Sequence, residues 1–110
     1  MAHQADELER ILKVLSVGTR VKIVQILQRR TLCVGALASQ LNLTQGAVSQ
    51  HLRLMRDAGL VIDEKRGHHV HYCLNERTLA RWRKHIDGLL APGPAVKLRC
   101  SNRTGGNREV

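Results

Sequence analysis

The chain is short of the aromatic residues that usually add mass to a small core. Its 110 residues include no phenylalanine, one tryptophan and one tyrosine. A core built from this sequence must therefore be mainly aliphatic, and a chain of this length is expected to form one domain. Because small domains with little aromatic mass often gain buried area by associating, we expect a dimer.

Cysteines and long apolar runs are also scarce. The three cysteines, Cys33, Cys73 and Cys100, are an odd number at wide spacing. Such spacing makes a poor disulfide framework and fits a reducing compartment. No apolar run reaches the roughly 18 residues that a membrane span needs, and no secretory signal pattern is present. We therefore expect a soluble, cytoplasmic protein that does not bind a membrane.

Acidic residues are outnumbered by basic ones. The chain has 18 lysines and arginines against 9 aspartates and glutamates, which gives a formal net charge of +9. A small protein with this charge attracts polyanions such as nucleic acids. The same charge also serves solubility, so it indicates a nucleic-acid partner only together with a surface that would bind one.

Residues 36–52 supply such a surface, because they have the pattern of two short helices joined by a tight turn. At about 100° per residue, the second helix places Val48, Leu52 and Met55 on one apolar stripe. On its opposite side lie small and polar residues, namely Gly46, Ser49, Gln50 and Arg53. One buried face and one polar face are typical of a helix-turn-helix that contacts base edges and phosphates.

Five helices and a β-hairpin are predicted from the spacing of apolar residues. The predicted helices span residues 6–17, 20–28, 32–41, 45–58 and about 76–90, and the predicted strands span 60–64 and 68–74 around a turn at 65–67. The order α-α-α-α-β-β-α predicts a mainly α, winged helix-turn-helix domain over residues 1–90, with the first and last helices left to form a symmetric dimer. Residues 91–110 are expected to be a flexible basic tail, since they have too few apolar residues to fold alone.

Several strings within this pattern resemble the ArsR/SmtB family of bacterial repressors. They are Cys33-Val34-Gly35-Ala36-Leu37-Ala38, Gln45-Gly46-Ala47-Val48-Ser49-Gln50-His51-Leu52, Arg56-Asp57-Ala58-Gly59-Leu60-Val61 and a hairpin that ends at Tyr72. The resemblance covers roughly residues 8–90. It implies a homodimer that binds a double-stranded DNA operator and blocks transcription until an inducer binds. In many members the inducer is a metal or metalloid ion, so such an ion is a possible ligand here. The alternative is a regulator of the same fold that responds to redox change or to an organic ligand, or that has no effector.

The predicted DNA contacts lie at the recognition helix and at the tip of the hairpin. They are Thr44, Gln45, Gly46, Ser49, Gln50, Arg53, Arg56, Lys65, Arg66 and His68. The free N–H groups at the helix start suit a phosphate, and Gln45, Ser49 and Gln50 suit base edges. The basic side chains would hold the DNA backbone. His51 lies closer to the buried stripe, so we expect it to make a hydrogen bond or a packing contact.

The sensor sites of this family are incomplete in the sequence. Metalloid-sensing members carry Cys-Val-Cys on the third helix and often another cysteine one turn later. Only Cys33 is kept here, with Gly35 and Ala38 in the other two places. One thiolate cannot close a three-thiolate site, and Cys33 also suits a packed helix as a small apolar residue. Zinc-sensing members use His and Asp or Glu pairs on the last helix, where this chain has only His85 and Asp87.

The hairpin histidines leave alternatives open. In a strand, His69, His71 and Cys73 alternate onto one face about 7 Å apart, which permits a soft-metal site. The weak candidate ligands for a metal are Cys33, His69, His71, Cys73 and Cys100. Alternatively, His68 and His69 approach DNA phosphates while His71 and Cys73 pack on the helices. A disulfide switch between two of the cysteines is a third possibility, and it requires Cα atoms within about 7 Å.

Two other classes of protein are less well supported by the sequence. An enzyme is not expected, because the chain has no His-Glu-x-x-His, no paired Cys-x-x-Cys and no glycine-rich phosphate loop. A winged helix can also serve as a protein-interaction module. The basic charge and the polar helix face favour DNA over that alternative.

Overall fold

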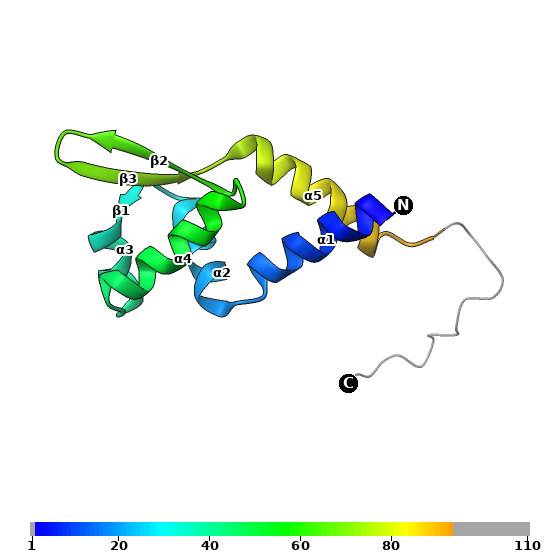
Figure 1. The fold of residues 1–110 in the computed structure, drawn as a ribbon, viewed down its shortest axis with the longest axis horizontal. Helices are drawn as coiled ribbons and strands as arrows, with labels where there is room; N and C mark the ends of the chain where they lie inside the picture. Colours follow the sequence, from blue (N-terminus) through cyan, green and yellow to red (C-terminus); the bar gives the residue numbers. More distant parts are fainter. Residues whose placement is uncertain (1, 94–110) are drawn as a thin grey trace.

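The computed structural model describes residues 2–93 and the side chains of residues 5–93. It is a bundle of helices with a β-sheet at one end (Figure 1). The elements are α1 (Ala2–Leu15), α2 (Gly18–Leu27), β1 (Leu32–Cys33), α3 (Val34–Leu41), α4 (Gln45–Asp57), β2 (Val61–Arg66), β3 (His69–Leu74) and α5 (Glu76–Leu90). The predicted tail lies outside the described residues from residue 94 onward, and so does Cys100. In the described part, none of the helices has the length and apolar character to cross a bilayer.

Helices α3 and α4 form the predicted helix-turn-helix, and local capping groups define the turn between them. Asn42 ends α3 in the left-handed conformation with φ 58°, and Leu43 N–H donates to the Ala38 carbonyl at 3.0 Å. This pattern closes a helix C-terminus. Thr44 then caps α4, because its Oγ1 accepts from Ala47 N–H at 3.1 Å. The two caps fix where one helix ends and the next begins.

The third helix starts later than predicted, because residues 32–33 form a strand. Leu32 pairs with Tyr72 and Cys33 pairs with His71, which adds β1 to the outer edge of β3 in a sheet of order β1-β3-β2. The prediction of helix over residues 32–41 was therefore wrong for its first two residues. Pairing with β3 satisfies backbone groups along an edge of the hairpin that would otherwise be open.

The hairpin itself forms as predicted, with a shorter turn. Arg66 pairs with His69, so only Gly67 and His68 lie between the strands. Gly67 adopts φ 63°, a conformation that glycine reaches without strain. Gly59, with φ 82°, ends the α4 region where a left-handed residue was predicted. These two glycines direct the chain out of α4 and around the tip of the hairpin.

The core is mostly aliphatic, as the composition required, and all five helices and the start of β2 contribute side chains to it. Its largest fully buried side chains are Ile11, Ile23, Leu37, Val48, Leu52, Met55, Leu60 and Val61. Trp82 of α5, at 5% exposure, is the only buried aromatic residue of the described part. Asn75 starts α5, because its Oδ1 accepts from the N–H groups of Arg77 and Thr78. This core holds α4 from one side and leaves its other side free.

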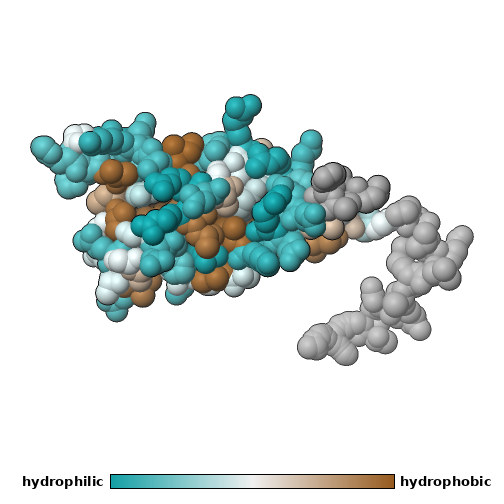
Figure 2. Space-filling view, viewed as in Figure 1, coloured by the Kyte–Doolittle hydropathy of each residue, from teal (hydrophilic) through white to brown (hydrophobic). Residues whose placement is uncertain are grey.

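Helices α1 and α5 lie side by side, away from the hairpin (Figure 1). Both carry leucines that the core does not cover, since Leu12 is 44%, Leu89 53% and Leu90 74% exposed. The face of the molecule shown in Figure 2 is mostly hydrophilic, with apolar patches along its middle. An apolar surface on these two helices is what the sequence predicted for elements that need a partner.

Candidate nucleic-acid interface

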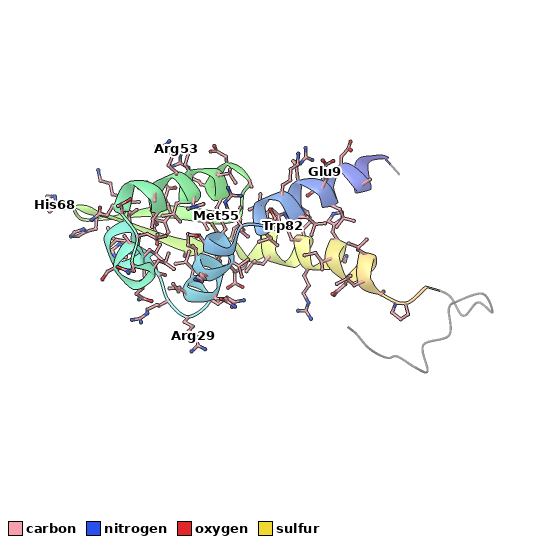
Figure 3. The ribbon with its side chains drawn as sticks, turned by 90° about the horizontal axis from the view of Figure 1, so that it is seen from below. Glu9, Arg29, Arg53, Met55, His68 and Trp82 are labelled. Atoms are coloured by element: carbon pink, nitrogen blue, oxygen red, sulfur yellow. The ribbon has the colours of Figure 1, made fainter. Side chains whose placement is uncertain are left out.

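Helix α4 has one fully buried face and one solvent-exposed polar face. Val48, Leu52 and Met55 are each 0% exposed. On the other side Gly46, Gln50 and Arg53 are exposed, and Ser49 is half-buried. Figure 3 shows Met55 inside the molecule and Arg53 on its outer surface. The two faces predicted from the helical spacing are therefore both present.

The start of α4 offers backbone donors beside polar side chains. Ala47 N–H donates to Thr44 Oγ1 and Val48 N–H donates to the Thr44 carbonyl. The N–H groups of Gln45 and Gly46 precede these bonds and belong to the first turn, where a helix has no internal acceptors. The Thr44 hydroxyl is used by the cap. Thr44 therefore caps the N-terminus of α4. Gln45 and Gly46 present the backbone N–H groups that suit a phosphate.

The side chain of Gln45 lies against α3. A Cβ atom added to Gly35 would lie 3.4 Å from Gln45 Nε2, at about van der Waals contact, so the Gln45 amide lies over the first turn of α3. This contact was not visible in the sequence, because it joins residues of two helices whose packing is set by the turn.

The hairpin adds basic side chains at the end of the molecule far from α1 and α5 (Figure 3). Lys65, Arg66 and His68 are all exposed. Arg66 Nη2 lies 3.1 Å from Glu64 Oε1, and Arg56 Nη1 lies 3.1 Å from Asp63 Oδ2. Exposed ion pairs of this kind contribute about 0–1 kcal/mol, so a phosphate can compete for either arginine. The pair with Asp63 also ties Arg56 of α4 to β2.

His51 makes the hydrogen bond that its position on α4 predicted. Its Nδ1 accepts from Nε of Arg20 at 3.2 Å. Burial lowers the pKa of His51 below its ordinary value of 6.5, and the neighbouring Arg20 charge lowers it further. The ring is therefore neutral near pH 7, which leaves Nδ1 free to accept. The partner was not predicted, since it lies 31 residues away in the chain.

The candidate metal ligands of the hairpin come only partly together. The rings of His69 and His71 are 6.4 Å apart in an edge-to-face arrangement, so they do share a face. Cys33 lies opposite His71 across the sheet, and Cys73 lies opposite Ile62. His71 Nδ1 is buried without a hydrogen-bond partner. Nevertheless, the described residues contain no group of three or more His, Cys, Asp or Glu side chains placed to hold a metal ion.

A three-thiolate metalloid centre does not fit the residues around Cys33. Soft trivalent ions require several thiolates. Gly35 and Ala38 supply no donor, and Cys33 and Cys73 are free thiols on different strands. The described residues therefore offer one thiol from β1 and one from β3, and Cys100 lies outside them. Cys33 itself is half-buried and is paired in a strand rather than packed in a helix.

This arrangement of helices, hairpin and exposed polar helix is that of a winged helix-turn-helix protein. Residues 18–63 match the model of bacterial regulatory proteins of the arsR family. The arsenical resistance operon repressor of Escherichia coli (strain K12) is 40% identical over 78 residues, which are 70% of this chain and 67% of that protein. The HTH-type transcriptional regulator Rv2034 of Mycobacterium tuberculosis is 39% identical over 79 residues, which are 72% of this chain and 74% of that protein.

A solved structure of a possible transcriptional regulator for arsenical resistance is also similar. Its TM-score is 0.69 at 34% identity, and the match covers 74% of this chain and 84% of that chain. The chain therefore belongs to the ArsR family of bacterial regulatory proteins. It is a DNA-binding transcriptional regulator of the winged helix-turn-helix type.

Proposed function

We propose that this chain is a homodimeric repressor that binds a double-stranded operator and is released from it by an inducer. The observation that carries the proposal is the division of α4 into a fully buried stripe and an exposed polar face next to a basic hairpin. The E. coli relative is named a repressor, which supports the direction of regulation. The proposal needs three parts, namely DNA contacts, a dimer and a release step.

The DNA contacts would divide into two kinds. Gln45, Ser49 and Gln50 would meet base edges in the major groove, where glutamine can bond adenine through two hydrogen bonds. The DNA backbone would be held by the N–H group of Gly46 and by the basic side chains Arg53, Arg56, Lys65, Arg66 and His68. Base contacts give sequence preference, whereas phosphate contacts give affinity for any duplex.

The dimer would form through the apolar surface of α1 and α5. Leu8, Leu12 and Leu89 line a shallow groove of about 530 Å³ on this surface. A second copy suits it because a two-fold axis brings the same apolar patch onto itself. Such a dimer would place two α4 helices about one duplex turn, roughly 34 Å, apart. It would then contact two half-sites of one operator.

The two kinds of DNA contact are separable by mutation. Gln50→Ala should weaken binding mainly to a selected operator, by about 1–3 kcal/mol for a good base contact. Arg66→Ala should weaken binding to all sequences and reduce the salt slope by roughly one unit. Fluorescence anisotropy with an operator duplex and a scrambled duplex, over a series of salt concentrations, measures both. Equal loss on both duplexes for both variants would show that the roles are wrongly assigned.

The release step is expected not to use a three-thiolate metalloid centre, since the described residues do not fit one. Arsenite added to the reduced protein on its operator should leave the affinity unchanged, and Cys33→Ser should behave as the wild type does. Parallel titrations with Zn²⁺, Cd²⁺ and an oxidant test the other ions and the disulfide alternative by the same gel-shift assay. Release by arsenite in the wild type but not in Cys33→Ser would overturn this expectation.

A further inference from the structure

Arg20 joins three helices through one guanidinium group. Its Nε donates to His51 Nδ1 of α4 at 3.2 Å. Its Nη1 donates to the carbonyls of Lys13 at 3.3 Å and Val14 at 3.2 Å, in the last turn of α1. Arg20 itself lies in the first turn of α2. One side chain therefore closes the C-terminal end of α1 and bonds the middle of the recognition helix.

The carbonyls that Arg20 contacts have no acceptor role inside the helix. The last four carbonyls of an α-helix lack intrahelical donors, and a cation near this end is also favoured by the helix dipole. The bonds to Lys13 and Val14 therefore stabilise the end of α1. The bond to His51 is different, because it satisfies no helix terminus. Its effect is to connect α4 to the point where α1 and α2 meet.

We propose that Arg20 is a positioning residue for operator recognition, which fixes α4 relative to α1 by bonding both helices at once. This inference rests on the proposed function, which assigns the dimer surface to α1 and the base contacts to α4. A dimer can place two α4 helices in successive major grooves only if each keeps its orientation to its own α1. His51 directly follows Gln50, so a rotation of α4 at this bond would move a base-contacting side chain.

The geometry requires an arginine at position 20. The guanidinium group presents donors in a fixed planar fork, so Nε and Nη1 can point to two different helices. A lysine ammonium is a single point with a flexible stem. In Arg20→Lys it would still reach the carbonyls at the end of α1, where the dipole favours it, but it would not also hold His51.

The bond to His51 makes this link sensitive to protons. Among the elements packed on α4, α3 has no ionisable side chain, and from β2 Asp63 is already bonded to Arg56. From α2, Lys22 is exposed and Arg20 is the cation in contact with the ring. Protonation of His51 removes the acceptor at Nδ1 and leaves two cations facing each other. The link is therefore intact above pH 6.5 and is lost as the pH falls below it toward the lowered pKa of His51.

The same shift predicts a pH effect on folding. The unfolded chain, with His51 near its ordinary pKa of 6.5, binds more protons than the folded chain as the pH falls. The free energy of unfolding therefore decreases from pH 6.5 downward because of this residue. At higher pH the ring is neutral in both states and makes no such contribution.

The test compares wild type, Arg20→Lys, His51→Asn and the control Arg29→Lys on DNA. Arg29 is exposed and lies on the side of the molecule away from Arg53 (Figure 3). The probe is a duplex selected by the wild type from a random pool, with a scrambled duplex beside it. The measured quantity is the ratio of the two affinities at about pH 7.5 and about pH 5.5, on either side of an ordinary histidine pKa. Protonation of the other histidines adds positive charge that strengthens binding to both duplexes, so its effect on affinity cancels in this ratio.

The expected results distinguish positioning from a structural role. Arg20→Lys should remain folded, and its ratio should be about tenfold below that of the wild type at about pH 7.5, as expected for loss of a hydrogen bond to a charged group, and close to that of the wild type at about pH 5.5, where protonation weakens the bond. The wild-type ratio should fall at the lower pH. His51→Asn should keep a high ratio at both, because the asparagine oxygen takes the place of Nδ1 and does not titrate. Arg29→Lys should match the wild type.

Two results would overturn the inference. One is an unchanged ratio in folded Arg20→Lys at the higher pH, and the other is the same pH dependence in His51→Asn and wild type. If Arg20→Lys fails to fold, the comparison of His51→Asn with wild type decides alone. If the wild type selects no duplex, the proposed function fails and the inference fails with it. A wild type that selects a duplex, with variants that do not differ from it, contradicts only the inference.

Discussion

Leu52→Ala should lower the free energy of unfolding by about 2–5 kcal/mol, the range for truncating a buried leucine. The Leu52 side chain is 0% exposed, and it lies at the centre of the buried stripe of α4 with Val48 and Met55. Its removal leaves a cavity between α4 and the core that surrounding aliphatic side chains fill only in part. Urea unfolding at one fixed protein concentration measures the change, since association would otherwise add to stability.

Leu54→Ala is the matched control for this prediction. Leu54 lies on the same helix and undergoes the same chemical change, but its side chain is 40% exposed. A substitution at such a position usually changes stability by no more than about 0.5 kcal/mol. Comparable losses in the two variants would contradict the orientation of α4, because the loss would then not follow the burial of the two leucine side chains.

Local patterns in the sequence were sufficient to predict the part of the fold that carries the polar helix. The helical period placed the stripe of Val48, Leu52 and Met55, and the caps at Thr44 and Asn75 and the turn at Gly59 followed from side chains a few residues apart. These features depend on neighbours in the chain. For this reason the two faces of α4 could be stated from the sequence, whereas their DNA contacts stay predictions.

Contacts between distant residues were not predictable in the same way. The pairing of Cys33 with His71 places β1 beside β3, although residues 32–41 have the apolar spacing of a helix. The bond between Arg20 and His51 spans 31 residues, and only the packing of α2 on α4 brings its atoms together. Whether the hairpin forms a metal site could not be predicted for the same reason. Alternation correctly put His69 and His71 on one face, but whether a third ligand joins them depends on the other elements.

The α1–α5 surface gives the prediction with the largest effect on function. Leu12→Glu should convert the proposed dimer to a monomer and lower operator affinity about 100-fold or more, because simultaneous binding of two half-sites is lost. A glutamate there would have to be buried unpaired against the apolar surface of a second copy. Leu12 is 44% exposed in the single chain, so the fold of the monomer should change little. Sedimentation and anisotropy with a full-length operator measure the two effects.

Lys84→Gln is the control, since it also lowers the charge by one unit. Lys84 is exposed on α5, on the side of the helix away from Trp82. It should leave the dimer intact and change operator affinity only through the weak long-range effect of one charge. If Leu12→Glu remained a dimer with full affinity, the two copies would have to meet through another surface. If it became a monomer that still bound the operator as tightly as the wild type, one α4 and one hairpin would suffice for recognition. The spacing between two copies, on which the role of Arg20 depends, would then be irrelevant.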